Sequence, residues 1–200
     1  MTRFRHVVRR GRYVRVVDPD WRRPLDPGFA AGRGGRWNPP GSFPLLYLCA
    51  NLEVARALVL NRFAGLPYGL LDLHPHRRPA LVETDVPERR MVDLVTDAGC
   101  RAAGLPSTYP VDGRGRRVGW TRTQPVGEAA HEQGEAGIAC RSAALARGAR
   151  SEELAWFVRA SADRLRTVRR RPFDHWFPRR VVGNRPSTIE GPQKEVYRWP

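Results

Sequence analysis

The sequence has almost no lysine and little cysteine. Lys194 is the only lysine, so nearly all of the 35 lysine and arginine residues are arginine. The three cysteines are far apart and form no Cys-x-x-Cys pair, which argues against a disulfide framework or a zinc site and predicts reduced thiols. The His-Pro-His of residues 74–76 has no further ligands at metal spacing, so we expect an exposed loop there and no bound metal.

Long hydrophobic runs are also lacking. The apolar segment Phe43–Ala50 is far shorter than a membrane span, and the N-terminal residues contain no apolar leader. These features predict a cytoplasmic protein without a membrane segment.

Acidic residues are outnumbered, with 20 Asp and Glu against 35 Lys and Arg, for a net charge of +15. Such a charge permits binding to nucleic acid, to an acidic protein or to an anionic small molecule. The sequence contains no helix-turn-helix, zinc-finger or RNA-recognition motif that would turn charge into base recognition. A solvated basic surface is therefore as good an interpretation as nucleic-acid binding.

The 200 residues suit one domain, which we place at residues 1–178 with a C-terminal tail over 179–200. Hydrophobic patterning predicts helices over 52–63, with Asn51 as N-cap, and over 125–134, and a short closing helix over 171–177. Residues 97–123 show little periodicity and predict loops with at most one short helix. Alternating or apolar segments predict strands at 11–18, 43–50, 80–86, 91–95, 137–143, 153–158 and 165–171. We expect the last two of these strands to pair with each other.

The octapeptide Gly-Gly-Arg-Trp-Asn-Pro-Pro-Gly, residues 34–41, is the most unusual local motif. Glycine allows positive φ and close approach of another group, and proline fixes φ. Between them, Arg36 offers a planar fork of five donors that suits a phosphate or a carboxylate. The alternative is a surface turn with a solvated Arg36 and with Trp37 packed on the core.

The motif also has a recognisable context. A strand with Tyr-x-Arg precedes it, Leu-Leu-Tyr-Leu and a helix follow it, and Gly-Ile-x-Cys-Arg-Ser-Ala comes much later. This order resembles the RES domain family over residues 11–178. The resemblance implies an α+β fold like that of ADP-ribosyltransferases, with a mixed, mostly antiparallel sheet split around a cleft and helices outside. It further implies a toxin that consumes NAD+, by hydrolysis or ADP-ribosyl transfer, and an Xre-type antitoxin as partner.

By this resemblance Arg36 corresponds to the family's arginine and Ser142 to its serine. Arg36 would hold the diphosphate of NAD+, with Arg15 as a second phosphate ligand, and Gly35 and Asn38 would complete the binding loop. An alternating strand places Arg15 in solvent equally well, and Asn38 could simply brace the loop.

Tyr47 and Ser142 are the implied catalytic residues. Tyr47 would contact the nicotinamide end of NAD+, and Ser142 would bind the ribose or the amide. Tyr47 could instead be a core tyrosine, and Ser142 an ordinary turn residue.

The family's glutamate is missing, because the matching helix position is Leu58. Glu53 lies on the same helix, but five residues at 100° each turn it about 140° away. We therefore expect slow NAD+ turnover, or a protein that binds a nucleotide or a partner without chemistry. Glu128, Glu132 and Glu135 are either a replacement for the missing acid or a solvated helix face.

Overall fold

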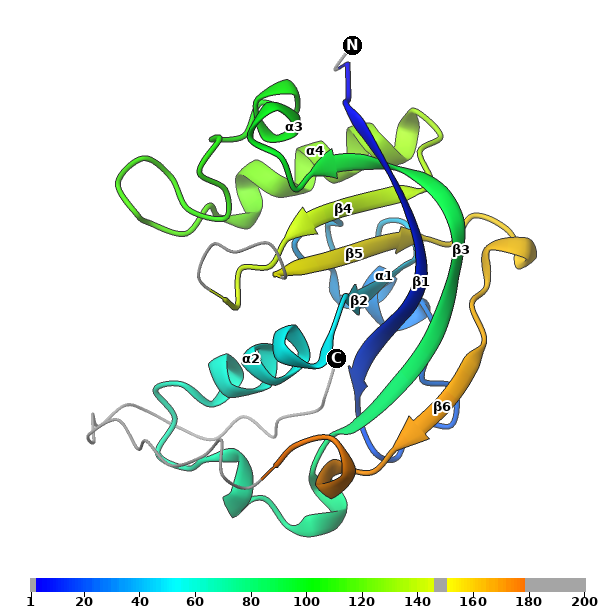
Figure 1. The fold of residues 1–200 in the computed structure, drawn as a ribbon, viewed down its shortest axis with the longest axis vertical. Coiled ribbons are helices and arrows are strands. Elements are labelled where there is room, and N and C mark those ends of the chain that lie inside the picture. The colour runs from blue at the N-terminus through cyan, green and yellow to red at the C-terminus, as the bar shows by residue number, and fades with distance from the viewer. Residues whose placement is uncertain (1–2, 146–150, 179–200) are drawn as a thin grey trace.

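A long antiparallel pair forms one side of the protein in the computed structural model, which describes residues 3–145 and 151–178. Strand β1 (His6–Val17) pairs with β3 (Ala80–Leu94), from His6 opposite Val92 to Val17 opposite Ala80. Both strands curve together along one side of Figure 1, with β6 (Thr167–Arg171) on the outer edge of β3. Alternating β-branched residues explain why these segments are extended.

Three short strands form the other half of the sheet. The central strand β5 (Glu152–Phe157) pairs antiparallel with β2 (Leu45–Cys49) and with β4 (Gly137–Arg141). One residue pair joins β1 to β2, and a parallel contact joins β3 to β4. The fold is thus α+β with a mixed, mostly antiparallel sheet, as the family resemblance implied, and the sheet has six strands rather than the seven expected from the sequence.

Helices cover the sheet at two places (Figure 1). Helices α3 (Asp97–Ala102) and α4 (Trp120–Glu132) lie beside β4, over a core that contains Leu45, Ile138 and Phe157. Helix α2 (Leu52–Phe63) packs on a separate core with Val14 and Leu81, closed by a 3₁₀ turn at Phe173–His175. Asn51 caps α2 as predicted, since its side chain accepts a hydrogen bond from the Val54 N–H at 3.0 Å.

Several predicted elements were wrong in extent or pairing. The two segments predicted at 80–86 and 91–95 belong to one strand, β3. Strand β1 pairs with β3 along most of its length, including the polar residues between the two segments. Strands β5 and β6 do not pair with each other, since β5 lies between β2 and β4. The closing helix is only the 3₁₀ turn at Phe173–His175.

Helical boundaries also differ from the prediction. Helix α4 starts five residues earlier than predicted, so Pro125 lies inside it rather than at its start. Helix α1 (Gly28–Arg33) was not predicted, because its Gly-Phe-Ala-Ala-Gly-Arg sequence has too few apolar residues for a helical pattern. The proposed tail at 179–200 lies outside the described residues.

The sequence also predicted reduced thiols and no membrane segment. Cys49, Cys100 and Cys140 are all buried, and no disulfide joins them in this structure. Within the described ranges, no helix is long and apolar enough to cross a bilayer.

Candidate functional site

The loop at residues 34–41 is closed around the side chain of Tyr47 on β2. The Tyr47 hydroxyl accepts a hydrogen bond from the Trp37 N–H and donates one to Asn38 Oδ1, both at 2.9 Å. A Cβ atom on Gly35 would lie 2.5 Å from that hydroxyl oxygen, so only glycine fits there. Gly34 has φ of 72°, and a Cβ on it would meet the Pro40 nitrogen at 2.6 Å. The two glycines are therefore needed to bring the loop against Tyr47.

Helix α4 holds the same loop from the other side. The Thr123 hydroxyl donates to the Arg36 carbonyl at 2.6 Å, and Gln124 Nε2 donates to the Gly35 carbonyl at 2.9 Å. Gly127 lets the helix backbone touch the loop, because a Cβ there would lie 1.7 Å from the Trp37 carbonyl oxygen. The loop backbone that carries Arg36 is thus fixed in place before any ligand binds.

This loop forms one wall of a cavity of about 410 Å³. That volume lies within the range of about 300–1,000 Å³ that is usual for small-molecule sites. Helix α2 provides another wall through Leu58, Val59 and Arg62, and the sheet provides its floor. The exposed ring of Trp120, at the start of α4, stands at the same cavity.

Three arginines line the cavity: Arg62 on α2, Arg15 on β1 and Arg36 in the loop. Arg15 is only 5% exposed, and among the described residues its Nη1 has no hydrogen-bond partner. Burial lowers the pKa of Arg15 to about 10, which leaves it charged at neutral pH. Arg36 is half-buried, and its Nη1 donates to the Val118 carbonyl at 3.2 Å. A buried cation with an unused donor is costly, and an anion in the cavity would offset that cost.

One carboxylate, Glu153, faces the cavity from the first half of β5, and it is the only acid among the described lining residues. Burial raises the pKa of the Glu153 carboxyl, and the neighbouring Ser142, the charge of Arg36 and the backbone of Ala143 offset part of that shift. Sequence reasoning missed Glu153, although alternation along 153–158 puts it on the same face as Ala155, which lies opposite Tyr47.

The structure brings most of the candidate site residues to one place. Arg15, Gly35, Arg36 and Tyr47 all line the cavity. Ser142 is buried near Glu153 and is not among the described residues that line the cavity. Asn38 is fully buried and braces the loop, its Nδ2 donating to the Ala30 carbonyl at 2.6 Å.

The acidic candidates lie elsewhere. Leu58 lines the cavity, whereas Glu53 on the same helix is exposed. The cavity lining does not include the three acids on and just after α4, Glu128, Glu132 and Glu135. Glu135 Oε1 instead lies 2.8 Å from His6 Nε2. These three acids therefore do not replace the missing glutamate.

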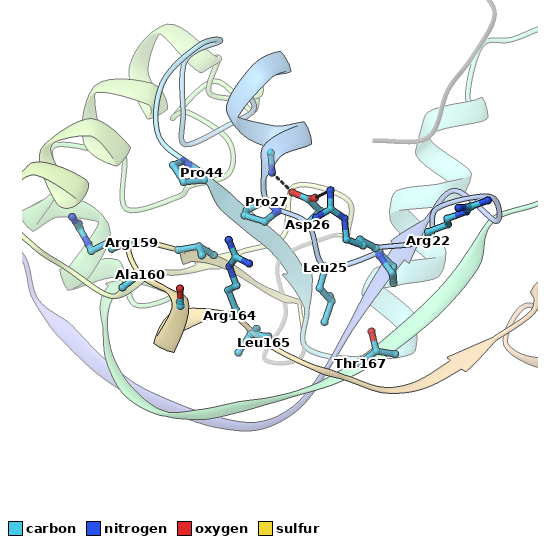
Figure 2. A pocket seen from close by; sticks show the side chains of 15 residues that line it. Arg22, Leu25, Asp26, Pro27, Pro44, Arg159, Ala160, Arg164, Leu165 and Thr167 are labelled. Atoms are coloured by element: carbon cyan, nitrogen blue, oxygen red, sulfur yellow. Dashed lines mark hydrogen bonds and ion pairs between the residues drawn. The ribbon is translucent and has the colours of Figure 1, made fainter.

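A second, larger hollow of about 700 Å³ lies between the segment before α1 and the connection from β5 to β6. Figure 2 shows Arg22 at one end of it, Arg159 at the other and Arg164 between them. Asp26 is the one acid in its lining, and its carboxylate is held by the Gly28 N–H at 2.9 Å and by Arg23 at 3.2 Å. This hollow has no aromatic side chain and no available carboxylate among its described lining residues, so we place the candidate site at the smaller cavity.

Comparison with known proteins agrees with this architecture. A chain in the crystal structure of the M. tuberculosis MbcT–MbcA toxin–antitoxin complex superimposes with a TM-score of 0.64 at 22% identity, covering 82% of this chain and 85% of that one. No curated protein matches the sequence. The family model of the RES domain matches residues 9–178, a span that contains the loop, Tyr47, Ser142 and Glu153. The chain therefore belongs to the RES domain family.

Proposed function

We propose that this protein binds NAD+ in the cavity between the 34–41 loop and helix α2 and consumes it slowly, by hydrolysis or ADP-ribosyl transfer. The observation that carries the proposal is that Arg15 and Arg36 both line the cavity and that Arg15 is buried with an unused donor among the described residues. A diphosphate supplies oxygens for both guanidinium groups, and Arg-phosphate hydrogen bonds are among the stronger polar contacts. Membership of the RES family points to NAD+ as the nucleotide.

The walls of the cavity suit the rest of such a ligand. The face of Trp120 and the ring of Tyr47 offer flat apolar surfaces for a nicotinamide or adenine ring. The hydroxyl of Tyr47 is already used twice within the loop, so its ring, rather than its hydroxyl, is available to the ligand.

Slow turnover follows from Leu58. Cleavage of the nicotinamide–ribose bond builds positive charge on the ribose, and a fixed carboxylate stabilises that charge. Leu58 lies at the cavity where RES proteins are expected to carry that glutamate, and a leucine supplies no charge. The activity is therefore proposed to lie below that of relatives with the acid.

An antitoxin is the proposed protein partner. The structurally similar chain belongs to a toxin–antitoxin complex, and an Xre-type protein is the partner that the family suggests. Growth arrest on expression of this chain, relieved by co-expression of such a protein, supports the pairing. Growth arrest without relief argues against it.

The site is tested with purified protein and NAD+, by calorimetry for binding and by chromatography for released nicotinamide. We expect saturable 1:1 binding and slow release of nicotinamide. A matched control carries Arg22→Gln and Arg164→Gln in the second hollow and is expected to bind equally well. No NAD+ binding by the unmodified protein refutes the proposal, and loss of binding in the control places the ligand in the second hollow.

A further inference from the structure

We propose that Glu153 is the catalytic carboxylate of this protein and acts from strand β5 in place of the acid that helix α2 lacks. This inference rests on the proposed function, the cleavage of NAD+. It names Glu153 as the negative charge that stabilises the cationic ribose during that cleavage. It also explains why an acid occupies the middle of the sheet.

The position of Glu153 is the first support. It lies on the central strand of its half-sheet, opposite Cys49 on β2 and Cys140 on β4, and it lines the same cavity as Arg36 and Leu58. Glu152, the preceding residue, points to the opposite face and is used in an ion pair with Arg9, with Oε1 2.6 Å from Nε. Strand alternation thus separates a structural acid from an acid directed at the cavity.

The neighbours of Glu153 are the second support. Ser142 and Ala143, just after β4, act on its carboxylate and favour its charged form. A carboxylate whose charged form is favoured in this way is suited to stabilise positive charge in a transition state. Ser142 is therefore a positioning residue in this scheme, because it acts through Glu153.

The charge environment of Glu153 within the described residues is the third support. The described residues contain no side-chain cation within salt-bridge distance of it, although Arg36 is close enough to act on its charge. A partly buried, unpaired carboxylate weakens the folded state, and such costs are commonly retained where function requires them. NAD+ offers the missing counter-charge, since its nicotinamide ring is cationic and its ribose becomes so during cleavage.

The chemical step balances without any further reactant than water. The bond between ribose C1′ and the nicotinamide nitrogen breaks, and its electron pair stays on that nitrogen. A water oxygen, or in ADP-ribosyl transfer the hydroxyl of an acceptor in place of water, then bonds to C1′, and the proton that it loses passes to bulk water. Glu153 in its ionised form stabilises the cationic ribose and accepts a hydrogen bond from the attacking hydroxyl.

Ionisation of Glu153 makes the reaction depend on pH. Groups that act on Glu153 are Arg36 in the loop, Tyr47 and Cys49 on β2, Cys140 on β4, Tyr109 before α4, and Ser142 after β4. Arg15 of β1 and Arg62 of α2 line the same cavity. Burial raises the pKa values of both tyrosines and both thiols, so these four groups are neutral at pH 5–8. The expected titration in this range is therefore that of Glu153 itself.

The test compares nicotinamide release by four proteins: the unmodified chain, Glu153→Gln, Glu132→Gln and the double variant Leu58→Glu/Glu153→Gln. Glu132 is an exposed acid away from the cavity and serves as the matched control. NAD+ affinity is measured on each protein, and folding is checked by circular dichroism. Gln keeps the shape of Glu and removes its charge.

We expect Glu153→Gln to lower kcat about 100-fold or more while changing KM little, as for loss of one charge-stabilising group. The control should keep full activity, and the double variant should recover part of the loss because its carboxylate enters the same cavity from α2. The kcat of the unmodified protein should rise with pH through a pKa above the ordinary glutamate value, and this rise should vanish in Glu153→Gln.

Three results overturn the inference. The first is a folded Glu153→Gln protein that releases nicotinamide at the unmodified rate. The second is an unmodified protein that binds NAD+ but releases no nicotinamide, which identifies a nucleotide-binding protein without chemistry. The third is an equal loss in the Glu132→Gln control. Failure to bind NAD+ at all would instead remove the proposed function, so the two failures are distinguishable.

Discussion

Leu58 and Glu153 line one cavity from different elements, the leucine from helix α2 and the glutamate from the central strand β5. An apolar side chain thus stands where the RES resemblance places an acid, and an acid stands on the floor of the same space. Substitutions at Leu58 and at Glu153 therefore measure how much each position contributes to the rate of nicotinamide release.

Leu58→Glu is expected to raise the rate of nicotinamide release at least about tenfold, because it adds a carboxylate near the developing positive charge. Leu58→Gln is the matched control, since it has the same shape and polarity without the charge. Both are measured under saturating NAD+. An equal gain from Gln would show that polarity, not charge, limits the reaction.

Arg36→Ala should weaken NAD+ binding about 10- to 100-fold, because hydrogen bonds to charged groups contribute about 1.5–3 kcal/mol. Neutralising the exposed Arg114, Arg116 and Arg117 of the outer loop should change the affinity little, since distant exposed charges are screened beyond about 8 Å. Calorimetry at 0.15 M salt measures both effects. Equal losses would indicate diffuse electrostatic binding, as for nucleic acid.

Gly35→Ala should reduce the free energy of unfolding by about 1–3 kcal/mol, the usual cost of forcing an extra group into a packed site. Its Cβ would lie 2.5 Å from the Tyr47 hydroxyl oxygen and would separate the loop from β2. Gly32→Ala on α1 is the matched control, because a Cβ there meets nothing within 4 Å. Urea denaturation should find the control no less stable than the unmodified protein, and equal destabilisation of both would contradict this account.

Glu153→Gln should make the protein more stable at neutral pH and leave its stability unchanged near pH 4. Burial raises the pKa of Glu153, so the folded state holds the proton more tightly than the unfolded chain. The stability contributed by the neutral carboxyl is present below the unfolded pKa and is lost as pH rises through the higher folded pKa. Denaturation of both proteins from pH 4 to pH 8 measures this difference, which should grow with pH. A constant difference would show that the Glu153 carboxyl has the same pKa in both states.

The local features of the site could be predicted from the sequence, because short-range chemistry decides them. Asn51 precedes an apolar helical segment and caps α2, and the glycines of the 34–41 loop mark a place of close approach. Trp37 is buried as a packing residue, as one interpretation of the loop held. The motif order also identified the family and its α+β fold.

The tertiary structure decided which polar residues meet. Glu153 is more than a hundred residues from Arg36 in the sequence, and only the order of strands, with β5 between β2 and β4, brings it to the loop. Sequence periodicity states which face of a strand a residue occupies, but not which strand lies beside it, because pairing depends on long-range contacts. The same reason explains why β5 and β6 were wrongly paired, and why the acid was sought on α4 rather than on the floor of the sheet.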